Sequence, residues 1–420
     1  MNTLDAEKMD ALLHKMGFEP THNESEADLI NVFACSVRQS AINRVDGRLK
    51  KWSKIRKQRP LTTLLTGCVL PKDKKGLGKK FDILIDTHKL HTLPQILKKR
   101  MQDIEDIFPE SDYFKLPTKH KSTFQAFVTI QEGCDKFCRY CAVPYTRGRE
   151  ISRPASQIVD EVNDLVKKGY KEITLLGQTV NSYKNPEKGT IKTFTDLIKT
   201  LAHIEGNFWI RFISPYPTDF SDELIEVMAT EKKICPHLHM PVQAGSNDML
   251  KKMLRKYTRE EYLDLIKRIR KKLPNAAITT DIIVGFCEET EENFKDTLDL
   301  YEKVKFDMTY TAQYSKRPGT QATKLFKDNI PQKEKKKREL ELNESVKKYA
   351  LINNKKLLKK TVPVLVESMK KGLLFGKTDT NKPILVKGGS KNLIGEFVTV
   401  EVEKALPWSL EGTLKKTPVT

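Results

Sequence analysis

The sequence lacks any long hydrophobic run. Its first residues, Met1-Asn-Thr-Leu-Asp-Ala-Glu-Lys8, contain no apolar stretch of the kind that opens a secretory signal. No run approaches the roughly 20 apolar residues that span a bilayer. The sequence therefore predicts a cytoplasmic protein without membrane association, in which cysteines stay reduced and serve metal binding or catalysis before disulfides.

Cysteine is sparse, with seven in 420 residues, and acidic residues are outnumbered, since 55 Asp and Glu face 75 Lys and Arg. A compact chain with a formal net charge of +20 repels itself, which indicates a polyanionic partner such as nucleic acid. A surface that is merely rich in lysine is the alternative. Hydrophobic residues make up 38% of the chain, so a disordered protein is excluded.

The periodicity of apolar residues divides the chain into three parts. Residues 1–105 predict a small α/β domain, with strands at residues 29–33 and 61–66. Residues 120–350 contain short strands separated by amphipathic helices, which is typical of a parallel sheet, either open or closed into a barrel. Residues 356–420 contain two strictly alternating segments, Thr361–Val366 and Phe397–Val402, together with turn glycines, which predicts an all-β barrel of OB-like size.

Two basic stretches belong to the first part. Arg48–Arg59 alternates basic residues with Leu49, Trp52 and Ile55, which predicts an amphipathic helix with a solvated basic face. Lys72–Lys80 is rich in lysine and glycine, and its composition predicts a loop.

Three cysteines follow the first strand of the second part with the spacing C-x3-C-x2-C: Cys134, Cys138 and Cys141. A structural zinc site takes four ligands, and no fourth Cys or His follows at zinc spacing. A cubane iron–sulfur cluster also normally takes four cysteines. Three thiolates would leave one iron open to bind a substrate. A zinc site completed by a remote ligand, or chance, is the alternative.

This motif, placed after the first strand of a β/α barrel and containing Phe137 and Tyr140, resembles that of the radical S-adenosylmethionine (SAM) superfamily. The resemblance implies that the open iron of a 4Fe–4S cluster chelates SAM. It also implies that an electron from the cluster cleaves SAM to methionine and a 5′-deoxyadenosyl radical.

Further segments resemble the methylthiotransferases of that superfamily, above all their MiaB-like branch. They are Cys141–Arg153, Leu176–Tyr183, His237–Ser246, Lys256–Tyr262, Thr280–Gly285 and Ala405–Gly412. The resemblance covers essentially the whole chain. It implies an α/β fold with a partial (β/α)6 radical SAM barrel, flanked by an N-terminal methylthiotransferase domain with an auxiliary 4Fe–4S cluster and a C-terminal TRAM domain that binds RNA.

The family resemblance implies methylthiolation of C2 of N6-isopentenyladenosine at position 37 of tRNA. One SAM supplies the radical that removes the C2 hydrogen, another supplies the methyl group, and the auxiliary cluster provides the methylthio group. The implied partners are the tRNA anticodon loop and an electron donor such as flavodoxin or ferredoxin, with the enzyme a monomer. No general base is expected, because acid–base side chains cannot remove an unactivated aromatic hydrogen and the cofactors carry that step.

The resemblance also assigns ligands. It implies that Cys134, Cys138 and Cys141 hold the SAM cluster and that Cys35 and Cys68 belong to the auxiliary cluster. The implied SAM contacts are Gln178, Asn181, Gln243, Ser246, Ile283 and Gly285. Each of these contacts has an alternative as an ordinary strand-end or helix-cap residue. Arg147 and Arg149 are candidates for contact with phosphate or substrate, with plain surface charge as an equal alternative.

The chain departs from the family pattern in three places, one of which is Phe33-Ala34, where Asn-Thr is usual before Cys35. It begins at Met1-Asn2, as if cut inside the family's Gly-Cys-Gln-Met-Asn, so Cys35 and Cys68 match the second and third auxiliary ligands while the first has no counterpart. We interpret this as a misassigned start; a real truncation, leaving a two-thiolate site, is the alternative. Cys287-Glu288 stands where Pro-Gly is usual.

Two other functions compete with this interpretation. One is a sister enzyme that acts on threonylcarbamoyladenosine in tRNA or on an aspartate of a ribosomal protein. Two segments argue against it, because the sister branches have different residues at these places: Gly177–Tyr183 and Pro144–Arg149. The other is an RNA-binding protein whose catalysis is impaired.

Overall fold

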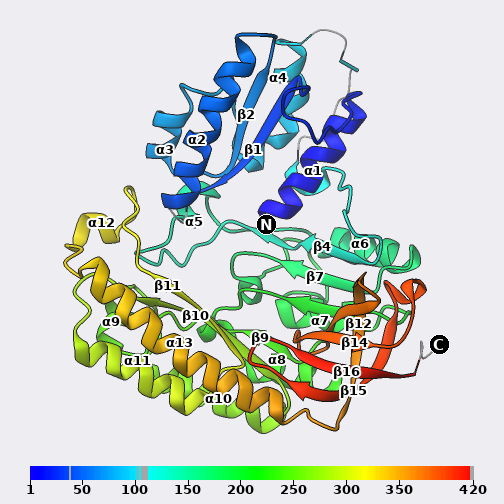
Figure 1. Ribbon diagram of the computed structural model, residues 1–420, viewed down its shortest axis with the longest axis vertical. Helices are drawn as coiled ribbons and strands as arrows, with labels where there is room; N and C mark the ends of the chain where they lie inside the picture. Colours follow the sequence, from blue (N-terminus) through cyan, green and yellow to red (C-terminus); the bar gives the residue numbers. More distant parts are fainter. Residues whose placement is uncertain (37–38, 102–103, 106–111, 417–420) are drawn as a thin grey trace. The chain divides into compact units, whose positions relative to one another are not determined.

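The computed structural model describes residues 1–36, 39–101, 104–105 and 112–416 (Figure 1). The chain forms two compact units, each made from separate stretches of sequence. The first, here called the cysteine unit, comprises residues 1–121, 132–151 and 315–326. The second, the barrel unit, comprises residues 122–131, 152–314 and 327–420.

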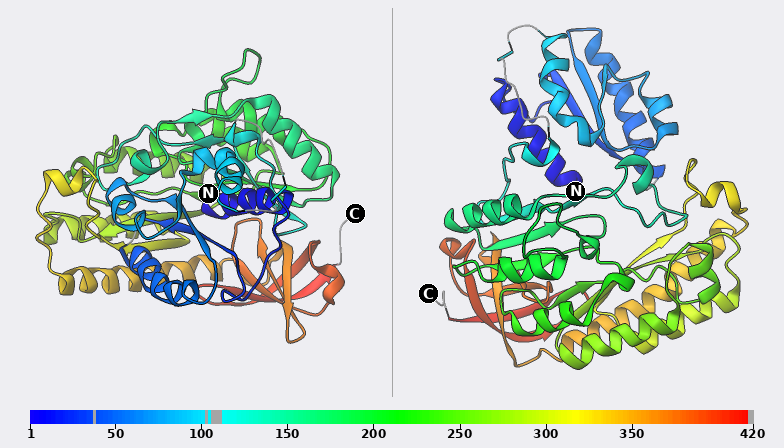
Figure 2. Two further views of the ribbon diagram at one scale, coloured as in Figure 1. Left: turned by 90° about the horizontal axis from the view of Figure 1, so that it is seen from above. Right: turned by 180° about the vertical axis from the view of Figure 1, so that it is seen from behind.

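The cysteine unit is built on a three-stranded sheet of parallel strands in the order β1-β2-β3. Its elements are α1 (Asn2–Lys15), β1 (Leu29–Cys35), α2 (Gln39–Arg56), β2 (Thr62–Cys68), α3 (Pro71–Leu77), β3 (Ile83–Leu84), α4 (Leu93–Lys98), α5 (Val143–Thr146) and α12 (Ala322–Leu325). The neighbouring residues Leu64 and Leu65 of β2 belong to two different apolar clusters, as strand alternation requires. Helices α1 and α4 cover one face of the sheet and α2 covers the other (Figures 1 and 2).

Helix α2 confirms the amphipathic helix expected from Arg48 onward. Its apolar residues Ile42, Val45, Trp52 and Ile55 are buried, whereas Arg48 stays exposed and pairs with Glu24. The prediction of a loop at Lys72–Lys80 is wrong over most of that range, because helix α3 forms there. Pro71 is the first residue of this helix, and its ring fixes φ at a helical value. Leu77 is the one buried residue of the helix, and a single apolar residue among lysines gives no helical pattern in the sequence.

Six parallel strands form the centre of the barrel unit, as the sequence predicts. They are β4 (Gln125–Thr129), β7 (Glu172–Leu176), β8 (Trp209–Phe212), β9 (His237–His239), β10 (Ala277–Val284) and β11 (Met308–Gln313). They pair as β4-β7-β8 and β9-β10-β11. A parallel bridge from Ile210 to Ile234 links β8 to the segment before β9. The short strands β5 (Gln131–Glu132) and β6 (Ile151–Ser152) lie outside this series.

Amphipathic helices connect the six strands. They are α6 (Ala155–Lys167), α7 (Phe194–Ala202), α8 (Asp222–Thr230), α9 (Asn247–Lys252), α10 (Arg259–Lys272) and α11 (Glu291–Val304). Thr193, Thr258 and Thr290 begin three of them with reciprocal capping boxes. The partial (β/α)6 barrel expected from the sequence is therefore confirmed.

A long helix, α13 (Gln332–Lys355), leads into a closed five-stranded barrel with the strand order β12-β13-β14-β16-β15. Its strands are β12 (Thr361–Lys370), β13 (Leu373–Thr378), β14 (Pro383–Lys387), β15 (Phe397–Ala405) and β16 (Leu410–Lys416). Alternate valines of β12 and β15 fill its core. The expected C-terminal all-β barrel is confirmed.

The small barrel packs against the amino-terminal ends of the large barrel's strands, within the same unit. Leu365 and Phe397 contact Trp209, the first residue of β8. The buried guanidinium of Arg211 donates to the carbonyls of Thr378 at 2.9 Å and Asp379 at 2.7 Å. The small barrel thus packs at the end of the strands opposite to their carboxyl-terminal ends. In open α/β sheets, ligands bind at the carboxyl-terminal ends.

Candidate functional site

The C-x3-C-x2-C segment forms a tight loop in the cysteine unit. The Cys134 amide donates to the Gly148 carbonyl at 3.3 Å, and the Cys141 amide donates to the Cys138 carbonyl at 2.9 Å. Gly133 has φ +72°, and a Cβ there would lie 2.0 Å from the carbonyl oxygen of Arg149. Only glycine therefore allows the loop to close on itself directly before Cys134.

Backbone amides point at two of the three sulfurs. The Lys136 amide donates to Cys134 Sγ at 3.5 Å, and the Val143 amide donates to Cys141 Sγ at 3.4 Å. Hydrogen bonds of this kind favour the charged thiolate, which is the form that binds metal. All seven cysteines lie in the described residues, and none forms a disulfide.

Within the described part of the chain, no three His, Cys, Asp or Glu side chains converge as ligands of a single metal ion would. A cubane cluster spreads its ligands more widely than a single metal ion does, because each thiolate binds a different iron. Three thiolates in one loop, with amide donors on two of them, fit three corners of a 4Fe–4S cluster better than they fit a closed zinc site.

Cys35 and Cys68 lie side by side. They are the last residues of β1 and β2, and the parallel register pairs them directly. Burial raises the pKa of the Cys68 thiol, although the nearby Arg147 guanidinium opposes the shift. Their adjacency at one sheet edge fits two corners of a second cluster.

Arg147 is held in a buried polar network that the sequence did not reveal. Its Nε donates to Cys68 Sγ at 3.0 Å, and its terminal nitrogens donate to Glu132 at 3.0 Å and to the carboxylate of Asp5. The side chains of Arg147 and Asp5 have no exposed surface. Burial raises the pKa of Glu132 to about 7, with Arg147 opposing the shift. The sequence positions of Asp5 and Glu132 do not indicate that they contact Arg147, because only the fold brings the three residues together.

The other arginine considered from the sequence, Arg149, is exposed and pairs with Asp135 at 2.6 and 3.0 Å. A second buried arginine, Arg317, contacts Asp73 at 2.5 Å. The same carboxylate accepts from Ser36 Oγ at 2.7 Å, so Arg317 braces the residue that follows Cys35.

The six residues expected to contact SAM all lie in the barrel unit, at or after the carboxyl ends of three strands. Gln178 and Asn181 follow β7, Gln243 and Ser246 follow β9, and Ile283 and Gly285 close β10. The backbone of Gln243 pairs with β10, because its amide donates to Asp281 and its carbonyl accepts from Ile283, both at 2.9 Å. The groups after β9 and β10 are thereby brought together.

Two of these side chains already have protein partners. The Asn181 amide group donates to the Tyr216 carbonyl at 2.8 Å and accepts from the Tyr216 amide at 2.7 Å, which ties the loops after β7 and β8 together. Ser246 Oγ accepts from Asn293 at 3.0 Å. Gln243 is buried with φ +73°, an uncommon backbone conformation for a residue with a side chain.

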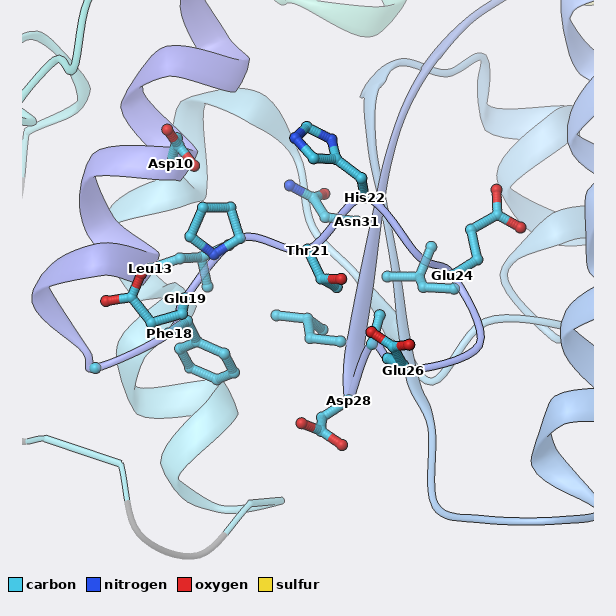
Figure 3. Close-up of a pocket in the computed structure, with 15 residues that line it drawn as sticks. Asp10, Leu13, Phe18, Glu19, Thr21, His22, Glu24, Glu26, Asp28 and Asn31 are labelled. Carbon is cyan, nitrogen blue, oxygen red and sulfur yellow. The ribbon is translucent and has the colours of Figure 1, made fainter.

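A large cavity of 640 Å³ lies in the cysteine unit between the end of α1 and the start of β1 (Figure 3). Figure 3 shows acidic side chains around it, among them Asp10, Glu19, Glu26 and Asp28. It contains none of the predicted site residues. Its carboxylates would repel a nucleic-acid backbone, so it is a poor candidate for the substrate site.

Comparison with known families agrees with this geometry. Residues 128–301 match the radical SAM superfamily, residues 355–415 match the TRAM domain, and residues 1–86 match the uncharacterized protein family UPF0004. The fold also resembles the radical SAM methyltransferase TsrM from Kitasatospora setae, with a TM-score of 0.53 at 13% identity over 75% of this chain and 66% of that one.

Curated relatives align along almost the entire chain. The tRNA-2-methylthio-N(6)-dimethylallyladenosine synthase of Carboxydothermus hydrogenoformans is 42% identical over 428 residues, covering 99% of this chain and 97% of its own. The enzyme of the same name from Thermoanaerobacter sp. is 43% identical, covering 99% and 90%. The chain therefore belongs to the radical SAM family of tRNA-2-methylthio-N(6)-dimethylallyladenosine synthases, as the resemblance of its motifs predicts.

Proposed function

We propose that this protein methylthiolates C2 of N6-isopentenyladenosine at position 37 of tRNA, with SAM as both radical source and methyl donor. The observation that carries the proposal is the three-cysteine loop, with amides directed at two sulfurs, in a chain that aligns from end to end with enzymes of that name. The C-terminal TRAM barrel and the net charge of +20 fit a tRNA substrate.

Cys134, Cys138 and Cys141 would hold the 4Fe–4S cluster that the family uses. When bound, that cluster supplies the electron that cleaves SAM to the 5′-deoxyadenosyl radical. The loop's own contribution would be to supply three thiolates, two of which accept backbone amide hydrogen bonds. Gln178, Asn181, Gln243, Ser246, Ile283 and Gly285 are proposed to bind SAM. The backbone pairing of Gln243 with β10 supports this proposal for the residues that follow β9 and β10.

Cys35 and Cys68 are proposed to hold an auxiliary 4Fe–4S cluster that provides the sulfur. Their direct pairing at the ends of β1 and β2 supports this role. Arg147, which donates to Cys68, would stabilise the thiolate form of that ligand. No third ligand converges on the pair within the described residues.

Other properties are proposed from the family alone. The electron donor would be flavodoxin or ferredoxin, the enzyme a cytoplasmic monomer, and the functional domains residues 1–105, 120–350 and 356–420. No helix in the described ranges combines the length and hydropathy needed to cross a bilayer.

The main test replaces Cys134, Cys138 and Cys141 together by Ala. Reconstituted under anaerobic conditions with dithionite, this variant should form no 5′-deoxyadenosine and no methylthiolated nucleoside in digested tRNA. Cys235→Ala is the matched control, because Cys235 is buried in the barrel unit and is not part of the motif, and it should keep both activities. Undiminished 5′-deoxyadenosine from the triple variant would refute the assignment.

The auxiliary cluster needs a separate measurement. The double variant Cys35→Ala, Cys68→Ala should bind less iron and sulfide per chain than the unaltered protein and lose methylthiolation, while it still forms 5′-deoxyadenosine. An unchanged iron content would contradict the auxiliary site and leave the radical site standing.

A further inference from the structure

A cavity of 280 Å³ lies in the barrel unit at the amino-terminal ends of three strands. His237, Ala277 and Met308, the first residues of β9, β10 and β11, line it. The turn between β13 and β14 and the connection between β15 and β16 also line it, so the cavity lies where the TRAM barrel docks. None of the residues proposed for SAM contributes to it.

Two accessible aromatic rings border this cavity. Trp408 is 50% exposed and Tyr310 is 56% exposed. The other two tryptophans, Trp52 and Trp209, are only 4% and 9% exposed. The His239 ring packs edge-on against Tyr310, with centroids 5.8 Å apart. Two accessible rings at one cavity offer a flat surface on which a partner can stack.

The cavity is also weakly basic. Lys377 and Lys382 line it, and Asp307 is its one carboxylate. Lys382 Nζ lies 2.6 Å from Asp307, so that charge is compensated, and Lys377 contacts Glu367 at 3.1 Å outside the lining. Burial lowers the pKa of His237 to about 3, so its imidazole is neutral and adds no charge. Both ammonium groups are paired with carboxylates in the free protein, so a phosphate would share them with Asp307 and Glu367 as a further hydrogen-bond acceptor.

We propose that this cavity binds one unpaired base of the tRNA substrate, stacked on Trp408 and Tyr310, with its phosphate near Lys377 and Lys382. Proteins bind single-stranded RNA by this combination of aromatic stacking and basic contacts. The volume lies near the lower end of ligand pockets, which suits a single base and not a longer segment. The inference rests on the proposed function, since it assumes that tRNA is the substrate.

The bound base is a neighbour of the reacting adenosine and not the adenosine itself. Thr279 lines the cavity, and Ile283, proposed to contact SAM, lies four residues further along β10. At about 3.3 Å per residue, the two positions are about 13 Å apart. The cavity therefore sets the register of the anticodon loop from the other end of the strands.

The test measures binding of an anticodon stem-loop RNA to the full chain. Trp408→Ala should weaken binding about tenfold, because a base loses its stacking surface, whereas Trp408→Phe should stay within about twofold of the unaltered protein. The matched control is Leu340→Ala, which truncates an exposed apolar side chain on α13 outside the cavity and should not change the affinity. In the absence of RNA, all three variants should form 5′-deoxyadenosine at the rate of the unaltered protein, which shows that the barrel is intact.

Abasic substitutions, made one at a time in the loop, identify the base. One of them should weaken binding to the unaltered protein about tenfold and have no further effect on Trp408→Ala, since both changes remove the same contact. The RNA should also quench the fluorescence of the exposed Trp408, and the abasic RNA should not.

The outcomes separate the two claims. If the unaltered protein methylthiolates tRNA and Trp408→Ala binds every RNA equally well, the base-binding cavity is wrong and the function stands. If the protein forms no methylthiolated nucleoside, the proposed function is wrong. The quenching and the abasic series then decide separately whether an RNA base enters this cavity.

Discussion

Arg147 shows how one side chain can satisfy several buried groups at once. Its guanidinium contacts Asp5, Glu132 and the Cys68 sulfur, and none of its surface is exposed. A buried ion pair adds little to the free energy of unfolding when compared with apolar side chains in the same place. Removal of one partner alone is strongly destabilising, because it leaves the other charge buried and uncompensated. The sequence suggested phosphate contact or surface charge for Arg147, because no local pattern encodes a partner more than 100 residues away.

Arg147→Met should therefore lower the free energy of unfolding by about 3–5 kcal/mol, since Asp5 and Glu132 lose their counterion. Urea unfolding of the protein without cofactors measures this. Arg149→Met serves as the control: its pair with Asp135 is exposed, so its unfolding midpoint should hardly change. Equal midpoints for the two variants would show that the buried network does not stabilise the fold.

His237 provides a prediction about pH. Burial, with Arg211 and His239 adding positive charge nearby, lowers its pKa from the ordinary 6.5 to about 3. Between pH 6.5 and pH 3, the imidazole is protonated in the unfolded chain but neutral in the folded chain. The free energy of unfolding therefore falls as the pH drops from 6.5 towards 3. His237→Gln should flatten that slope in urea unfolding at pH 7, 6 and 5. Parallel slopes for the two proteins would mean that His237 titrates normally.

Among the elements, the cysteine loop depends on two glycines with left-handed backbones, and they differ in their surroundings. A Cβ on Gly133 would strike the Arg149 carbonyl, whereas a Cβ on Gly148 would meet nothing within 4 Å. Gly133→Ala should therefore displace the loop and reduce both iron binding and 5′-deoxyadenosine formation by tenfold or more, as an order of magnitude. Gly148→Ala carries only a backbone penalty of about 1–2 kcal/mol and should retain most of its iron. Iron content per chain distinguishes the two; the opposite ranking would contradict this account of the loop.

Elements with a clear period could be predicted from the sequence. The strands expected at residues 29–33 and 61–66 form as β1 and β2, and the amphipathic helix expected from Arg48 forms as part of α2. Helix α3 could not be predicted, since one buried leucine among lysines and glycines gives no period. Spacing and resemblance single out five of the cysteines, and their role as cluster ligands stays a prediction. The aromatic cavity could not be predicted, because Tyr310 and Trp408 are nearly 100 residues apart and meet only through the docking of two barrels.

At the scale of the whole molecule, charge governs binding to the substrate. The protein has a net charge of +20, and its binding to tRNA releases counterions from the phosphates. Because added salt opposes this release, tRNA affinity should fall about tenfold or more between 50 and 200 mM salt. SAM cleavage without tRNA should hardly respond over the same range, which makes it the internal control. Removal of residues 360–420 should weaken tRNA binding and reduce the salt dependence. Salt-independent tRNA affinity would argue against phosphate contacts as its main source.

The cysteine unit is assembled from three stretches of sequence, and this has a consequence for its synthesis. Residues 1–121 emerge from the ribosome first, and β1 and β2 can pair at once. The counterion for Asp5, however, is Arg147, and the counterion for Asp73 is Arg317. The nascent unit therefore carries buried carboxylates and an adjacent pair of thiols until most of the chain has been translated. A fragment that ends at residue 121 should fold poorly by itself, although it contains the complete β1-β2-β3 sheet.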